Sequence, residues 1–470
     1  MQTNRLPTGG RIDRQQPLKF TFNGKSYDAY HGDTLASALL ANGINLVGRS
    51  FKYHRPRGII SSGAEEPNAI IQIGRGATSE PNQKATQIEL YDGLQAEVDK
   101  GWPSLSFDIA IINDWFSRLF SAGFYYKTFM YPANFWNIYE SFIRKASGIG
   151  KAPTEKDPDT YSHHNIHCDV LVVGAGPSGL MAAKTAAESG ARVIIADEQN
   201  EFGGSLLFSK ELIDGKSCQK WAAEQTAALN GCREVTCLPR STVFGYYDYN
   251  FLTILERCTN HLGERVSGRD RQRLWRVRAK KVILAQGAFE RPLVFCNNDR
   301  PGIMLASAVS NYINRYSVLP GKRAVIFTNN DSAYQTALDL SAAGVEALTI
   351  IDCRAENLSS DLVKKVNAAG IDIRYKSLIT NVKGSSYVKA VEVAMFDETE
   401  NIVINSEKSL IFCDLIAVSG GWSSSIHLHS QAGGSSIWDE KRCCFIPGDS
   451  KQENISIGAC NGAWNLNDCF

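Results

Sequence analysis

The residues most able to do chemistry form a glycine-rich turn, Gly174-Ala175-Gly176-Pro177-Ser178-Gly179. In such a turn the first glycine permits a tight bend, the second lets the backbone approach a phosphate, and the third lets a helix pack closely on a strand. Backbone N–H groups at the start of the following helix attract an anion. The spacing predicts a site for the pyrophosphate of a dinucleotide.

An acidic pair, Asp197 and Glu198, follows this turn, with Glu198 lying 24 residues after Gly174. A carboxylate at this distance typically accepts hydrogen bonds from the ribose hydroxyls. Two carboxylates would also repel a 2′-phosphate. The pair therefore favours NAD over NADP.

The elements that must position these residues follow one another in the order of a Rossmann βαβ unit. A buried strand is expected at Cys168–Val173, a helix at Leu180–Ser189 ended by Gly190, and a second strand at Arg192–Ala196. Three later features fit the first nucleotide domain of a disulfide-reductase-like protein: the loop Gly203-Gly204-Ser205, the strand Ser241–Phe244 with Val243, and the strand from Lys281 that ends at Gln286-Gly287.

A second βαβ pattern begins with the strand Gly321–Phe327 and continues through a helix at Ser332–Ala343. Its turn, Thr328–Ala333, contains no glycine, so side chains would crowd a pyrophosphate and Asp331 would repel it. Near the C-terminus, Ala459 occupies the place where flavoproteins of this architecture usually carry an aspartate that contacts the flavin. We therefore expect a two-dinucleotide Rossmann architecture that binds one dinucleotide, NAD, in the first domain.

The N-terminal segment predicts a small β-grasp, ferredoxin-like domain. Residues alternate around an Asn23-Gly24 hairpin turn, Asp33 is a plausible helix N-cap, and Gly43 should end the helix. All twelve cysteines lie at or after Cys168. Because [2Fe–2S] clusters are held by cysteine thiolates, the domain is expected to hold no Fe–S cluster.

The connecting segment 101–167 is rich in aromatic residues up to Ile149 and polar after it. We expect the aromatic residues to be buried against neighbouring domains, with a subunit interface as the alternative. The polar stretch 151–167 is interpreted as a linker, and its His163, His164 and His167 as solvated residues rather than metal ligands.

Composition excludes several classes of function. The chain has 470 residues and a formal net charge of +1, so neither nucleic acid nor an anionic membrane is an expected partner. Residues 1–17 contain no apolar run like that of a signal peptide, which favours a cytoplasmic location with reduced thiols.

Three longer motifs carry a resemblance to a known family. The segments Arg49–Gly58, Glu290–Phe295 with Asn298–Gly302, and Ala417–Ser423 closely resemble the α subunit of heterotetrameric sarcosine oxidase. The resemblance implies a complex with β, γ and δ subunits, in which FAD in the β subunit oxidises sarcosine and an FMN at the α/β interface passes electrons to oxygen. It places NAD contacts at Ser178, Asp197, Glu198, Gln199, Ser205, Val243, Ala459 and Leu466. The family continues into an aminomethyltransferase-like folate domain, so the chain is expected to be truncated before it.

The expected domains are 1–100 (β-grasp), 101–167 (connecting segment), 168–320 (first Rossmann domain), 321–410 (second, degenerate domain) and 411–470 (return to the first). Two other functions stay open: a stand-alone FAD-dependent NAD(P)H oxidoreductase, and the α subunit of a related opine, proline or dimethylglycine dehydrogenase. A catalytically silent scaffold is a further alternative, because no residue is identified as an acid, base or nucleophile, and no metal ligand is expected.

Overall fold

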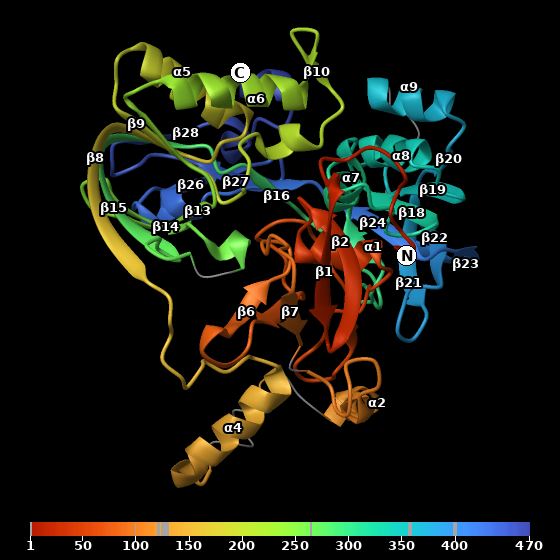
Figure 1. Cartoon of the computed structure of the whole chain (residues 1–470). Coiled ribbons are helices and arrows are strands. Elements are labelled where there is room, and N and C mark those ends of the chain that lie inside the picture. The colour runs from red at the N-terminus through yellow and green to blue at the C-terminus, as the bar shows by residue number, and fades with distance from the viewer. Residues whose placement is uncertain are drawn as a thin grey trace. The chain divides into compact units, whose positions relative to one another are not determined.

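The computed structural model describes residues 2–98, 100–119, 123, 131–263, 266–355, 360–397 and 402–470. The chain divides into two compact units, each built from two separate stretches of sequence. Unit 1 comprises Met1–Pro158 and Pro292–Gly420, and unit 2 comprises Asp159–Arg291 and Gly421–Phe470. The colour bar of Figure 1 gives the residue numbers by which these stretches can be located in the ribbon.

The N-terminal part of unit 1 is a five-stranded sheet in the order β2-β1-β7-β5-β6. Asn23 and Gly24 have positive φ, as the tight hairpin between the first two strands requires. The strands are β1 (Asp13–Phe22), β2 (Lys25–His31), β5 (Ile70–Ile73), β6 (Glu80–Lys84) and β7 (Leu94–Glu97), and a short β3 (Gly48–Arg49) pairs with β4 (Pro56–Arg57).

Helix α1 (Leu35–Ala41) is fully buried beside this sheet. Its N-cap is Thr34, whose side chain accepts from the Ser37 backbone N–H, while the Ser37 hydroxyl accepts from the Thr34 backbone N–H. The expected cap, Asp33, instead accepts from the Ser37 hydroxyl at 2.6 Å and pairs with Arg5. Aspartate and threonine are both good N-cap residues. The carboxylate of Asp33 binds Arg5 and the Ser37 hydroxyl, and Thr34 is the N-cap.

The loop between β4 and β5 is organised around one buried carboxylate, that of Glu66. Its Oε2 accepts from the backbone N–H groups of Ile60 and Ser61, both at 2.8 Å, and its Oε1 from those of Asn68 (2.7 Å) and Ala69 (3.1 Å). Burial raises the pKa of Glu66, and the four backbone hydrogen bonds partly counteract that rise. This side chain supplies the acceptors that a buried irregular loop otherwise lacks.

The second part of unit 1 is a parallel sheet in the order β17-β24-β18-β19-β20, next to a three-stranded antiparallel sheet β21-β22-β23. Helices α7 (Ala306–Asn314), α8 (Ser332–Ala342) and α9 (Asp361–Ala368) accompany the parallel sheet. The strands are β17 (Ile303–Leu305), β18 (Arg323–Thr328), β19 (Ala347–Asp352), β20 (Asp372–Arg374), β21 (Ser377–Lys383), β22 (Ala390–Asp397), β23 (Ile402–Phe412) and β24 (Leu415–Ser419).

The aromatic segment 102–149 contains α2 (Ile112–Trp115) and α4 (Trp136–Ser147). Leu105, Ile111, Tyr139 and Ile143 are half-buried, whereas most of its described large apolar side chains are exposed, among them Trp115 (79% exposed) and Phe142 (68% exposed). The expectation that they are buried against neighbouring domains is therefore wrong for these residues. Residues 120–122 and 124–130 of the segment lie outside the described part of the chain.

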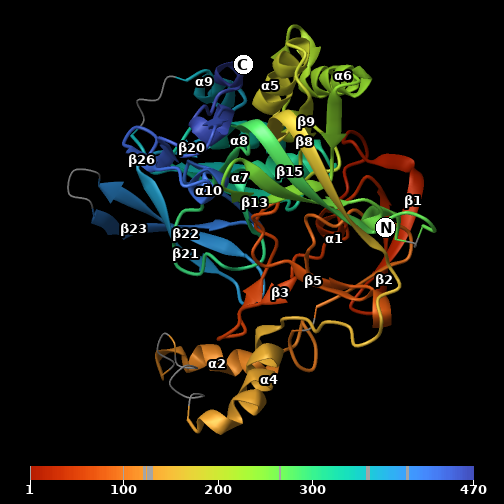
Figure 2. The same ribbon diagram turned by 90° about the vertical axis from the view of Figure 1, so that its left-hand side faces the viewer.

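Unit 2 contains a seven-stranded sheet in the order β12-β9-β8-β15-β14-β13, with β28 also paired to β15. Strand β8 (Tyr161–Val173) starts well inside the stretch expected to be a linker, because its first half pairs with the exposed half of β15 (Gln272–Leu284). The remaining strands are β9 (Val193–Ala196), β12 (Val235–Leu238), β13 (Ser241–Tyr247), β14 (Phe251–Arg257) and β28 (Asn454–Ser456). Helices α5 (Pro177–Glu188) and α6 (Cys218–Gly231) lie close to each other near β9 (Figure 2), and side chains of both belong to a separate apolar core.

In the part of the chain that the structure describes, no helix has the length and apolar character needed to cross a membrane.

Candidate dinucleotide site

The glycine-rich turn lies between β8 and α5, where the sequence predicts it. Gly174 has a φ of +96°, and a side chain on it would collide with the carbonyl oxygen of Ala285 at the end of β15. A side chain on Gly179 would overlap the carbonyl oxygen of Gly174. Both positions therefore exclude every residue with a Cβ, which explains the outer glycines of the motif.

The middle glycine, Gly176, has a different environment. It is the N-cap of α5, with Pro177 in the first turn of the helix, and a Cβ added to it would meet no described atom within 4 Å. The outer face of the turn is therefore open at the N-terminus of a 12-residue helix. The unpaired N–H groups and the helix dipole make this the place where a diphosphate would be held.

Asp197, at the end of β9, is part of the framework of the turn. Its Oδ2 accepts from the backbone N–H of Ala175 at 2.7 Å, and its Oδ1 from that of Gln199 at 2.9 Å. Glu198 follows, and its carbonyl oxygen accepts from Arg257 Nη2 at 2.5 Å. Because Asp197 already binds the turn, the expectation of a ribose-binding carboxylate now centres on Glu198.

The other predicted residues surround the same turn. The Gly203 N–H donates to the Ala175 carbonyl at 2.8 Å, and a Cβ on Gly204 would lie 3.0 Å from the Gly176 Cα. The Gly203–Ser205 loop therefore passes directly beside the turn. Ser178 Oγ donates to the carbonyl of Cys469 at 2.8 Å. Cys469 is the last residue of a short 3₁₀ helix that begins at Leu466.

Sequence reasoning missed a cluster of polar side chains around Gln286, which lies just beyond the C-terminal end of β15. Gln286 Nε2 lies 3.1 Å from His427 Nε2, and Ser425 Oγ lies 3.2 Å from His427 Nδ1. Ser424 Oγ donates to the carbonyl of Ala459 at 3.0 Å. Burial lowers the pKa of His427, which keeps the imidazole neutral near pH 7.

One hydrogen-bond acceptor of this cluster is available to a ligand. Gln286 Oε1 is covered and finds no hydrogen-bond partner among the described residues. Gly287, next along the chain, has a φ of +77°, and a Cβ there would meet no described atom within 4 Å. Covered acceptors normally have a partner, so this end of the site fits the polar second half of a dinucleotide. The only sequence signal for it was the run Ser423-Ser424-Ser425 just before His427.

The second nucleotide turn, between β18 and α8, is filled by its own side chains. Asn330 Nδ2 donates to the carbonyl and to the hydroxyl of Ser419, at 3.2 and 3.0 Å. Arg354 bridges Asp331 at 2.8 Å and Asp352 at 2.7 Å. Asp352 ends β19, the place where a Rossmann domain carries its ribose-binding acid, and here it pairs with an arginine. These contacts favour the interpretation of this turn as vestigial.

The cysteines form no disulfide in this structure. All twelve are free, and burial raises the pKa of Cys168 to about 12 and those of Cys237 and Cys460 to about 11. A thiol with a raised pKa is a poor nucleophile at neutral pH.

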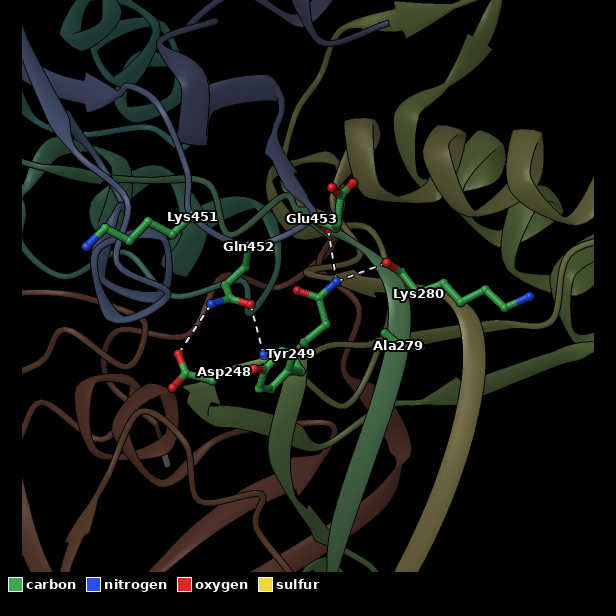
Figure 3. A pocket seen from close by; sticks show the side chains of 8 residues that line it. Asp248, Tyr249, Ala279, Lys280, Lys451, Gln452 and Glu453 are labelled. Atoms are coloured by element: carbon green, nitrogen blue, oxygen red, sulfur yellow. Dashed lines mark hydrogen bonds between the residues drawn. The ribbon is translucent and has the colours of Figure 1, made fainter.

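A pocket of about 550 Å³ lies away from the turn, between the β13–β14 hairpin and the loop before β28. Figure 3 shows that its polar side chains contact the groups around them. Asn250 Nδ2 donates to the carbonyls of Lys280 and Glu453, and Gln452 Oε1 accepts from the Tyr249 N–H. These hydrogen bonds hold the hairpin to the neighbouring loop, so we assign the pocket a structural role.

Comparison with known proteins agrees with this geometry. The family model for pyridine nucleotide-disulphide oxidoreductases matches residues 168–440, more than half of the chain. The chain belongs to this family. The solved structure of L-proline dehydrogenase from P. horikoshii aligns with a TM-score of 0.60 at 18% identity, covering 98% of this chain and 71% of that one, which shows a shared fold.

Among curated proteins, the chain is similar to α subunits of sarcosine oxidase. It is 46% identical to that of Rhizobium meliloti (strain 1021) over 98% of this chain and 45% of the relative, and 38% identical to that of Corynebacterium sp. (strain U-96) over 97% and 42%. The resemblance expected from the sequence motifs is confirmed. The chain spans less than half the length of these relatives.

The same comparisons correct the description of the N-terminal domain. The model for a 2Fe-2S iron-sulfur cluster binding domain matches residues 15–101, which contradicts the expectation of a cluster-less domain without Fe–S. That expectation rested on cysteine positions alone, because residues 15–101 contain no cysteine. The match follows the residue pattern of the whole domain instead, and assigns it to an iron–sulfur class. The thiolates usual for such a cluster are not among the matched residues.

Proposed function

We propose that this chain is the dinucleotide-binding α-type subunit of a multi-subunit sarcosine oxidase. Its similarity to sarcosine oxidase α subunits along 97–98% of its length supports this assignment. The observation that carries the NAD-binding part is the open face at Gly176, at the N-terminus of α5. The complex would include β, γ and δ subunits in the cytoplasm and carry out the oxidative demethylation of sarcosine to glycine, with formaldehyde or methylenetetrahydrofolate and H₂O₂ as the other products.

In this proposal each part of the first site has a distinct task. The N–H groups at the start of α5 bind the diphosphate, Asp197 holds the turn in shape, and Glu198 accepts from ribose hydroxyls. The Gln286–His427 pair orients the second half of the dinucleotide. NAD is chemically a hydride carrier, FAD would lie in the β subunit, and FMN at the α/β interface would transfer electrons to oxygen.

The alternative of a stand-alone FAD-dependent NAD(P)H reductase is less well supported. Such an enzyme needs a second usable nucleotide turn, and here Asn330 and Arg354 occupy that place. It often uses a reactive cysteine pair, whereas burial raises the pKa of Cys168, Cys237 and Cys460 in this chain. An α subunit of a related opine, proline or dimethylglycine dehydrogenase would fold in the same way, so only substrate tests separate it.

The test of NAD binding uses two valine substitutions at open glycines. Gly176→Val would place a branched side chain where the diphosphate is expected, whereas Gly231→Val, at the end of α6, is equally free of described neighbours and remote from the turn. Mass spectrometry of the nucleotides released on denaturation should find NAD with the parent chain and with Gly231→Val, and none with Gly176→Val. NAD retained by Gly176→Val would refute this site.

The test of the subunit assignment is activity on assembly. The chain alone should not oxidise sarcosine, because no described residue was identified as an acid or base for the amine chemistry. Adding a β subunit of the heterotetrameric enzyme should produce sarcosine-dependent peroxide. Turnover by the chain without a partner would overturn the assignment.

A further inference from the structure

The aromatic segment 102–149 concentrates apolar surface in one part of unit 1. Of the 31 exposed large apolar residues among those described, 13 lie in these 48 positions. They are Trp102, Phe107, Ile109, Ile112, Trp115, Phe116, Leu119, Tyr131, Phe135, Trp136, Ile138, Phe142 and Ile149. We call this set the apolar face.

The area of the apolar face is too large for an ordinary protein surface. An aromatic side chain buries roughly 150–250 Å² when fully covered, and most of these residues expose half or more of theirs, so together they present on the order of 1,000 Å². The largest apolar patch on a typical monomer is about 300–600 Å², whereas one side of a stable interface covers about 800 Å². The apolar face thus has the size of an interface.

The way in which the segment is anchored points in the same direction. The carboxylate of Asp108 is buried: its Oδ2 lies 2.6 Å from His54 Nδ1, and its Oδ1 accepts from the N–H groups of Trp102 and Ala110, both at 3.1 Å. Arg49 Nε donates to the carbonyl of Leu105 at 2.8 Å. At the other end, the Gly150 N–H donates to Asn82 Oδ1 at 3.0 Å. The first end of the segment is therefore held by buried or half-buried polar contacts and the second by an exposed hydrogen bond, while most of its large apolar side chains are exposed.

Helix α4 also exposes the apolar side chains of one of its faces. Ile138 and Phe142 of the helix, with Phe135 just before it, recur at the spacing of one helical face, and all three are half or more exposed. On the opposite side, Glu140 and Arg144 pair with each other at i,i+4. Figures 1 and 2 both draw α4 projecting away from the strands of the N-terminal sheet. An amphipathic helix in this position has an apolar face that unit 1 does not cover.

We propose that the apolar face of segment 102–149 docks the β subunit of the proposed complex, through an apolar patch on that partner surrounded by polar residues. The inference rests on the proposed function, because the similar proteins are by name subunits of larger enzymes. A partner chain fits better than a membrane. Directional contacts at both ends hold the segment in place, and a surface held in place suits a protein of complementary shape. Central aromatic residues supply most of the affinity in such interfaces.

The test replaces two anchors and compares them with matched controls. Trp115→Ser with Phe142→Ser removes two exposed side chains of the apolar face. Val294→Ser with Tyr249→Ser removes two that are 90% and 86% exposed elsewhere. Binding of the full chain to a recombinant sarcosine oxidase β subunit is measured by sedimentation velocity. The first pair should weaken binding roughly tenfold or more, and the second should leave it unchanged.

Each outcome of this experiment has one meaning. If the parent chain does not bind the β subunit, the proposed function fails. If the parent binds and the Trp115/Phe142 variant binds equally well, the docking surface alone is refuted. If that variant instead abolishes self-association, or flotation with vesicles of equimolar phosphatidylcholine and phosphatidylglycerol, a second copy or a membrane replaces the partner chain and the inference is overturned.

Discussion

Replacing Glu66 by glutamine should lower the free energy of unfolding of unit 1 by about 2–4 kcal/mol. Each carboxylate oxygen accepts two backbone N–H groups at 2.7–3.1 Å. Glutamine retains one oxygen, so two N–H groups would face an amide NH₂. A hydrogen bond to a charged acceptor contributes about 1.5–3 kcal/mol, which gives about 3–6 kcal/mol for the two that are lost. Since burial raises the pKa of Glu66, removing the charge returns part of that sum.

Hydrogen exchange measured by mass spectrometry gives the most local readout of this change. Peptides that cover residues 58–70 should lose protection, while peptides from unit 2 should exchange at the parent rate. Glu65→Gln makes the same chemical change one position earlier on an exposed side chain and serves as the control. Equal protection of the 58–70 loop in Glu66→Gln and the parent would refute the view that this carboxylate organises the loop.

Three further expectations follow from single side chains. Burial, followed by the nearby charge of Arg57, lowers the pKa of Lys100 to about 8. The native state thus releases this proton at lower pH than the unfolded chain, so the free energy of unfolding should rise between pH 8 and 10.5 by less than about 1.4 kcal/mol per pH unit. Urea titrations at several pH values measure this slope. Lys100→Met should abolish the rise, and an unchanged slope in the variant would contradict the assignment. His427→Ala should weaken NAD binding about 3- to 10-fold in calorimetry at pH 8, where a ring with a lowered pKa is neutral; equal affinity would remove His427 from the site. Asp197→Ala leaves the Ala175 N–H without its acceptor and should lower the stability of unit 2 by about 2 kcal/mol in thermal unfolding. A bulky residue at position 330 in place of Asn330 should leave NAD binding intact.

The nucleotide turn was predictable because its constraints are local. Gly174 and Gly179 are required by backbone atoms a few residues away or on the adjacent strand, so the pattern of glycines records the geometry. The filled second turn was predictable for the same reason, since the missing glycines leave Asn330 and Asp331 in the turn itself.

The remaining features depend on partners that are distant in sequence. His427 lies 141 residues from Gln286, and nothing near either residue signals that they meet. The start of β8 was hidden because residues 161–167 are polar, and their strand forms by pairing with β15 rather than by burying an apolar face. Exposure of the aromatic segment could not be inferred from composition, because burial depends on the surfaces that neighbouring elements offer.

The ligand-based interpretation of the N-terminal domain failed for a related reason. Cysteine positions report on the ligands of one cofactor, whereas the class of a domain is set by the pattern of its core, here residues such as Phe20, Leu39 and Ile71. The match over residues 15–101 therefore detects the class where the ligand pattern did not.

The filled second turn also affects how electrons would move between the chain and the cell. In a reductase with two open sites, soluble NADH docks on the second domain and exchanges hydride with the cofactor on the first. Here Asn330 is tied to Ser419 and Arg354 to Asp331, so this docking position is closed by the folded chain itself. If the proposed function holds, we expect electrons taken from an amine not to reach the cellular NADH pool through this turn.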